Sequence, residues 1–286
     1  MNADDKNNTD FWNEELSEYD SFYNQLKEFF ISIRKKDDMV FQLLSKKLFE
    51  LPALGEKTSY PKTCMILIAF LVRVNFIKCS IIDICEKDDN YSSKILFRSL
   101  IEHYFKFLYV YINAIKIKND SFGDEYQFYL DYKERILLLK SLKKNAKIFE
   151  QYNKDINNFQ LLCEVYPEYK ALSENEMNRR TKQFEIDNII EFLSSQGFQK
   201  DSAFLEAIIP KYSELSSYVH GGILAEKNLF YDSDYEKSIN QIKEIVDLTL
   251  AIDIGTKSFV MMFFFIATKE KEFLFFSKRF QEIMKE

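Results

Sequence analysis

Glycine and proline most constrain the fold of this sequence, because the chain has only 6 Gly and 4 Pro in 286 residues. Strand-rich folds of this length need many tight turns, and such turns use Gly, Pro, Asn and Asp at positions with special backbone angles. Long stretches without a chain breaker instead favour long helices. The sequence therefore predicts an all-α fold, a single multi-helix bundle domain with long antiparallel helices.

The few Gly and Pro residues mark where the predicted helices end. We expect a disordered start at residues 1–9 and a single all-helical domain over 10–286, because no fixed repeat and no low-complexity linker divides the chain. In this arrangement the residues from about 61 to 222 form the core of the domain, and helices within 10–51 and 234–285 pack against it. The long helices are predicted at 10–36, 38–51, 61–86, 91–117, 125–151, 234–269 and 270–285.

Shorter helices are expected between residue 154 and the start of the helix at 234–269. Two segments, Ser173–Glu176 and Ser233–Glu236, have the spacing of a capping box, which marks the first turn of a helix. Pro210 is expected to open a short helix, because proline suits the first helical turn. Gly221 and Gly222 are expected to end it.

The cysteines and the first residues predict the compartment. The four cysteines show no C-x-x-C spacing, and three of them lie in strongly apolar helical stretches, which is typical of buried free thiols in a reducing compartment. The polar, acidic start MNADDKNNTD does not have the pattern of a signal peptide. We therefore predict a cytoplasmic protein. Its net charge of −6 argues against a broadly basic surface.

Two segments, Cys64–Cys85 and Ile245–Ala267, are apolar enough to raise the question of a membrane. Both segments contain charged residues, and a charged side chain costs a few kcal/mol at the centre of a bilayer. Buried core helices are therefore the better interpretation. We predict no membrane association. The charges inside the two segments are Arg73, Lys78 and Asp83 in the first and Asp247, Asp253 and Lys257 in the second.

A polar stripe follows the predicted helix at 91–117, around one of the two histidines of the chain. At 100° per residue, five polar residues fall on one face and the aromatic and aliphatic residues on the other, which should pack into the core. Arg98 and His103 flank this face and could act on a common ligand. The alternative is an ordinary solvated face with an i,i+4 ion pair. The five residues are Arg98, Ser99, Glu102, His103 and Lys106.

The second histidine, His220, ends the segment YSELSSYVHGG. A histidine in the last turn of a helix can cap free carbonyl groups, so a structural role is one interpretation. The other is a role in a polar pocket, to which the hydroxyl groups of Tyr212 and Ser216 would contribute. The sequence has no Gly-rich phosphate loop and no H-E-x-x-H zinc helix. We therefore expect no metal site and no cofactor.

The segment Arg98-Ser-Leu-Ile-Glu-His103 resembles the R-x-x-x-x-H motif of the HEPN superfamily (higher eukaryote and prokaryote nucleotide-binding). These are all-helical proteins that include metal-independent ribonucleases of toxin, CRISPR and abortive-infection systems. The pattern Y-x-x-L-S-x-x-V-H-G at Tyr212–Gly221 also looks like that of a large uncharacterised bacterial helical family. The two patterns together span residues 97–221.

The resemblance implies roles for individual residues. His103 would be the general base on a ribose 2′-hydroxyl, Arg98 would stabilise charge on the phosphate, and the motifs of two protomers would meet. His220 would join them, and Ser99, Glu102, Tyr104, Lys106, Tyr212 and Ser216 would support the site. The chain departs from the family pattern after the Arg, where it has Ser99 in place of Asn, Asp or His. It departs again two residues after the His, where it has Phe105 in place of the Tyr of the toxin variant.

The resemblance thus predicts a homodimeric, metal-independent RNA endonuclease of a bacterial defence (abortive infection) or toxin module. RNA would be its substrate, and a protein partner encoded nearby is possible. The alternative is a non-catalytic helical interaction or sensor protein that binds a protein partner or a nucleotide. In a third interpretation the chain is a helical scaffold, and neither histidine belongs to a site.

Overall fold

The computed structural model describes residues 3–148, 157–196, 202–223, 225–227 and 235–285. Well over two thirds of the chain lies in helices, and the described residues include no strand. The all-α prediction is therefore confirmed.

Three long helices, α3 (Pro61–Cys85), α4 (Asn90–Ile117) and α11 (Tyr235–Thr268), pack along one another and hold much of the core. The connection between α3 and α4 is so short that the two run antiparallel, as predicted for this bundle. On these three helices pack α1 (Ala3–Leu48), the short α2 (Leu51–Glu56), α9 (Ser202–His220) and α12 (Glu272–Lys285).

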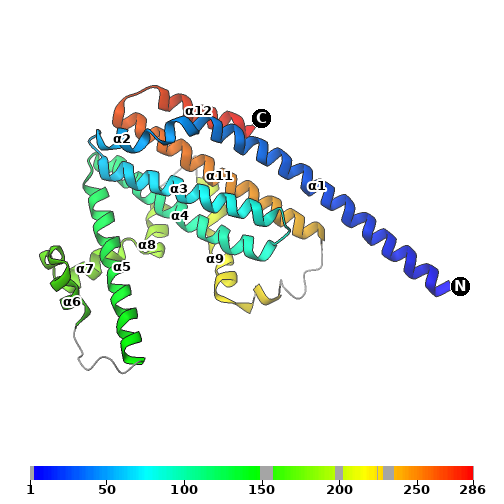
Figure 1. Cartoon of the computed structure of the whole chain (residues 1–286), viewed down its shortest axis with the longest axis horizontal. Coiled ribbons are helices and arrows are strands. Elements are labelled where there is room, and N and C mark those ends of the chain that lie inside the picture. The colour runs from blue at the N-terminus through cyan, green and yellow to red at the C-terminus, as the bar shows by residue number, and fades with distance from the viewer. Residues whose placement is uncertain (1–2, 149–156, 197–201, 224, 228–234, 286) are drawn as a thin grey trace.

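The helix α5 (Ser121–Ile148) runs steeply away from the long helices, and a group of short helices lies on the same side of the molecule (Figure 1). A continuous set of buried apolar side chains joins this group to the long helices. The members of the group are α6 (Asn158–Val165), the 3-10 helix η1 (Pro167–Ala171), α7 (Glu174–Lys182) and α8 (Ile186–Ser195).

Several helix boundaries differ from the prediction, since α5, for example, begins at Ser121 and not at 125, and the first large difference concerns α1. The structure has one continuous helix from Ala3 to Leu48, where the sequence predicts disorder at 1–9 and a break near residue 37. No Gly or Pro precedes Pro52, and Asp37 is held inside the helix by an ion pair with Lys78. Residues 1 and 2 lie outside the described part. In Figure 1 the N-terminal half of α1 extends beyond the end of the bundle.

The second difference concerns α9, which begins at Ser202 and contains Pro210 in its interior instead of beginning there. Its buried residues Leu205, Ile208 and Tyr212 are three and four residues apart and face the bundle on both sides of the proline. Packing of this apolar stripe outweighs the hydrogen bond that proline cannot donate.

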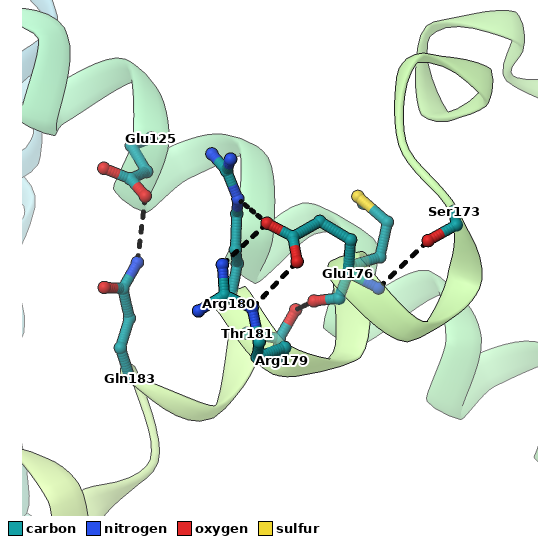
Figure 2. Close-up of polar contacts among 8 residues, drawn as sticks. Glu125, Ser173, Glu176, Arg179, Arg180, Thr181 and Gln183 are labelled. Atoms are coloured by element: carbon teal, nitrogen blue, oxygen red, sulfur yellow. Dashed lines mark hydrogen bonds and ion pairs between the residues drawn. The ribbon is translucent and has the colours of Figure 1, made fainter.

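The predicted cap of α7 is present in half of its expected form (Figure 2). The hydroxyl oxygen of Ser173 accepts a hydrogen bond from the backbone N–H of Glu176 at 3.3 Å, as an N-cap does. The carboxylate of Glu176 does not reach back to complete the box. It binds Arg179 and Arg180 at 2.7 Å instead. The second predicted box includes Ser233, which lies outside the described residues.

By length and composition, α3 and most of α11 could each cross a membrane, and 44% and 61% of their most apolar windows are buried inside the bundle. Three charged residues of these windows, Lys78, Asp253 and Lys257, are buried and lie next to one another. Cytoplasmic location and the absence of a membrane stay predictions. The four cysteines are free thiols, and all but Cys79 are buried.

Candidate functional site

The part of the polar stripe that contains Arg98 and Glu102 lies against α9. The helix is capped by Asp89, whose carboxylate accepts from the backbone N–H of Ser92 at 2.9 Å. Its buried side, with Phe97, Leu100 and Phe105, fixes the rotation of the helix against the core. The stripe therefore meets the side of α9 that presents Tyr212, whose ring stands edge-on to Phe105.

Arg98 is held between two partners. Its Nη2 donates to the hydroxyl oxygen of Tyr212 at 3.0 Å, and its guanidinium lies 4.5 Å from the centre of the Tyr212 ring. Its Nη1 lies 3.5 Å from Oε2 of Glu102, one turn along α4. Only 16% of the side chain is exposed, and among the described residues its buried Nε has no hydrogen-bond partner. The Nε–H is thus a buried donor to which none of the described residues offers an acceptor.

Glu102 links the other members of this cluster. It accepts from Lys106 at 2.6 Å and from the Tyr212 hydroxyl at 3.3 Å. Burial alone would raise the pKa of Glu102, but the charges and hydrogen bonds of Lys106 and Arg98 outweigh it and lower the pKa. Burial next to Glu102 also raises the pKa of Tyr212 to about 12. The cluster of Arg98, Glu102, Lys106 and Tyr212 therefore carries one more positive than negative charge at neutral pH.

His103 faces a different side of α4. Its Nδ1 lies 2.8 Å from the backbone oxygen of Ser99, and because a carbonyl oxygen only accepts, Nδ1 carries the proton. The other ring nitrogen, Nε2, is then an acceptor. Burial is the main cause that lowers the pKa of His103 below its ordinary value of 6.5, and the positive charges of Lys106 and Arg73 act in the same direction. The ring is thus neutral at neutral pH, as a general base must be.

Arg98 and His103, which the polar stripe suggests could act on a common ligand, are turned to different neighbours in the structure. They are about 140° apart around the helix. Arg98 is turned to α9, whereas His103 is close enough to Arg73 of α3 to interact with its charge. The sequence therefore identifies both residues correctly as half-buried polar groups of α4, but not the neighbours to which each is turned.

His220 does not join His103. It is the exposed last residue of α9, followed by Gly221 with a φ of 64°. Two residues earlier, Tyr218 contacts Tyr91 near the start of α4. That level of α4 lies twelve residues, or about 18 Å of helix, before His103. The expectation that His220 joins the His103 site is therefore not met, because antiparallel packing of α9 on α4 sets the two histidines at opposite ends of the contact.

The structure also places the supporting residues. Tyr104 is a core residue, 5% exposed, with its ring next to Phe107 and Phe204, and is not available to a ligand. Ser99 contributes its backbone carbonyl to His103. Ser216 is half-buried one turn after Tyr212.

The sequence analysis missed the continuation of the polar stripe toward the start of α4. Lys94 lies one turn before Arg98, is 8% exposed, and donates to Tyr218 at 3.2 Å and to Gln241 of α11 at 2.8 Å. Asn90, a further turn back, donates to the same Gln241 oxygen at 3.0 Å. The signal in the sequence is the four-residue spacing of Asn90, Lys94 and Arg98.

The chain matches the model of a family of unknown function, DUF5677, over residues 65–238. This match covers more than half of the chain, which therefore belongs to that family. Neither the curated proteins nor the solved structures include a match to the chain. The matched segment contains α4, α9 and the whole cluster around Arg98.

Proposed function

We propose that this member of a family of unknown function is a metal-independent RNA endonuclease of a bacterial defence or toxin module, similar to the HEPN ribonucleases. One observation carries the proposal: His103 is a neutral imidazole with Nε2 free to accept, on the helix that also holds the net positive cluster around Arg98. A base and a cationic group are what cleavage next to a ribose 2′-hydroxyl requires.

In the proposed reaction, Nε2 of His103 takes the proton of the 2′-hydroxyl, and the 2′-oxygen attacks the adjacent phosphorus. The bond to the 5′-oxygen breaks, and that oxygen takes a proton from solvent. The products are a 2′,3′-cyclic phosphate and a free 5′-hydroxyl. Arg98 would stabilise the negative charge that develops on the phosphate oxygens through the 16% of its side chain that is exposed.

The different directions of the two residues favour a composite site. Because Arg98 and His103 of one chain are turned to different neighbours, the base of one protomer would work with the arginine of a second. A two-fold dimer, the commonest symmetric oligomer, would complete such a site if α4 lay at its interface. Light scattering at micromolar concentration should then give a dimer, and an active monomer would contradict the composite site.

The two histidines provide a matched pair of variants. The purified protein should cleave single-stranded RNA in EDTA and leave DNA intact, because DNA lacks the 2′-hydroxyl. His103→Ala should slow cleavage by roughly a hundredfold or more through loss of the base. His220→Ala, a change at the exposed end of α9, should retain wild-type activity. The proposal would be refuted if the wild-type protein neither cleaved RNA nor was toxic on expression. It would also be refuted if a folded His103→Ala variant kept full activity.

The pH dependence gives a second test. A general base is lost when it is protonated, so activity should fall only when the pH drops below the lowered pKa of His103, that is, below 6.5. The acidic limb of the rate profile should be absent from any residual activity of His103→Ala. An acidic limb centred above pH 7 would assign the base to another group.

A second candidate, a non-catalytic interaction or sensor protein, is favoured by the burial of Arg98 against Tyr212. In this case the guanidinium holds α9 on α4 and has no substrate. Arg98→Lys would then lower stability, because lysine keeps the charge but loses the planar contact with the ring, and neither the wild type nor the variant would cleave RNA. In the ribonuclease the same variant would lower cleavage more than stability.

A further inference from the structure

The first half of α1 leaves the bundle. Figure 1 shows it extending as a single helix beyond the end of the bundle, and we call residues 3–23 the arm. From Leu26 onward, one apolar stripe of α1 is buried against the bundle. Most of the stability of a helix in a protein comes from such packing, so the arm needs a partner surface of its own. The buried members of the stripe are Leu26, Phe30, Ile33, Val40 and Leu44.

The sequence continues the same stripe along the arm. At 100° per residue, five aromatic residues of the arm fall within about 60° of Leu26 around the helix axis. An amphipathic stripe on a helix that leaves its own bundle is typical of an interaction surface. The five residues are Phe11, Trp12, Tyr19, Phe22 and Tyr23.

The charge of the arm limits what it can bind. Residues 3–23 contain seven acidic residues and one lysine, which gives a net charge of −6. The whole chain also has a net charge of −6, so the rest of the chain is neutral overall. An acidic helix is repelled by nucleic acid, by an anionic lipid surface and by the arm of a second copy. The surface that fits the arm is therefore both apolar and basic.

The last half of α5 has a surface of this kind. Residues 136–148 contain four lysines and no acidic residue. Leu138 and Leu142, one turn apart, are 60% and 54% exposed. Lys140 and Lys144, also one turn apart, are exposed and form no ion pair with the described residues. Exposed leucines next to unpaired lysines complement an apolar stripe flanked by carboxylates.

The two surfaces match in length but lie far apart in one chain. Residues 11–23 and residues 136–148 each span about 20 Å of helix at 1.5 Å per residue. Figure 1 shows the arm and α5 at opposite ends of the molecule. An arm therefore meets this part of α5 only in a second copy. A two-fold axis lets each copy give its arm and receive that of the other, so the pairing closes at a dimer.

We propose that the arm of one protomer binds the basic, leucine-bearing end of α5 in a second copy of this chain. The leucines of α5 cover the aromatic stripe of the arm, and the lysines lie beside its carboxylates. The proposal does not depend on RNA cleavage, because its tests measure association alone.

A charge exchange tests the pairing. Lys140→Glu/Lys144→Glu on α5 and Glu14→Lys/Glu18→Lys on the arm each bring like charges together, so each double variant alone should dimerise at least roughly tenfold more weakly than the wild type by sedimentation velocity. An equal mixture of the two double variants should dimerise like the wild type. In the mixed dimer the lysine-bearing arm meets the glutamate-bearing α5, and the other contact is unaltered.

A matched variant controls for the change in net charge. Lys271→Glu/Lys278→Glu makes the same change at exposed residues of α12 and should dimerise like the wild type. Circular dichroism checks that every variant is folded. Unchanged dimerisation of either test variant, or a mixture that stays dissociated, would overturn the pairing of the arm with α5. A wild-type protein that stays monomeric at about 100 µM would exclude a second copy and assign the arm to a different basic protein.

Carbodiimide cross-linking locates the contact without any mutation, because it joins a carboxylate directly to an amine that touches it. In a dimer of isotope-labelled and unlabelled copies, mixed-isotope peptides should connect an acidic residue of the arm with Lys140 or Lys144. Mixed-isotope links from the arm that reach only other lysines would refute the assignment to α5.

Discussion

Asp253 should be among the residues on which the stability of this bundle depends most. Asp253→Asn keeps the size of the side chain but removes the negative charge between Lys78 and Lys257, so that two buried ammonium groups share only Asp37. Breaking a buried ion pair by removal of one partner typically costs about 3–5 kcal/mol. Because both lysines are at least 96% buried, solvent can screen little of this cost. That is a large part of the roughly 5–15 kcal/mol by which a domain is stable.

Urea unfolding followed by circular dichroism measures this effect. With a slope of about 2–3 kcal/mol per M, the midpoint of Asp253→Asn should fall by roughly 1–2 M at an unchanged slope. Glu244→Gln is the matched control, because it removes the carboxylate of an ion pair with Lys211 in which the glutamate is half exposed. It should cost no more than about 1 kcal/mol.

A compensating double variant separates charge from packing. Asp253→Leu combined with Lys257→Met removes one negative and one positive charge together and leaves Lys78 with Asp37. Apolar replacement of a buried pair is often neutral or stabilising, so the double variant should recover most of the stability lost by Asp253→Asn. If the urea midpoint of Asp253→Asn equals that of the Glu244→Gln control within error, the cluster is solvated and the reasoning is wrong.

Three other perturbations have expected outcomes. Asp120→Ala should cost about 1 kcal/mol in urea unfolding, because its carboxylate accepts from the first backbone N–H groups of α3, those of Lys62 and Thr63, both at 2.8 Å. Gly123→Ala should cost about 1–3 kcal/mol, since a Cβ there would lie 2.8 Å from the backbone nitrogen of Thr63. Tyr212→Phe should cost about 1–2 kcal/mol through loss of the bond from Arg98, and thermal unfolding that matches the wild type would contradict it.

Helix positions were largely predictable because the chain breakers and caps act locally. The predicted helices 61–86, 91–117 and 234–269 differ from α3, α4 and α11 by one residue at most at each end. Pro61 begins α3, and Asp89 caps α4. The prediction failed where packing outweighs a local signal, as in the uninterrupted α1 and at Pro210 within α9.

The candidate site was predictable only within one helix. Periodicity correctly identified Arg98 and Glu102 as polar residues of an otherwise apolar α4, because they are one turn apart. It could not identify Tyr212 as the partner of both, since that contact joins residues more than 100 positions apart and depends on the register of α9. The same register separates His220 from His103, which spacing along the chain cannot reveal.

The buried charge cluster explains two features that the sequence presents as unrelated. Charges inside α3 and α11 argue against a membrane span, and the predicted helices 10–36 and 38–51 place a break near residue 37. In the structure Lys78, Asp253 and Lys257 are tolerated in apolar helices because they pair across the bundle, and α1 continues past Asp37 because that residue is one of the partners. A core that needed only to be stable could replace these charges with apolar side chains at little cost. What the charged pairs add is direction, because they join α1, α3 and α11 at one level of the bundle.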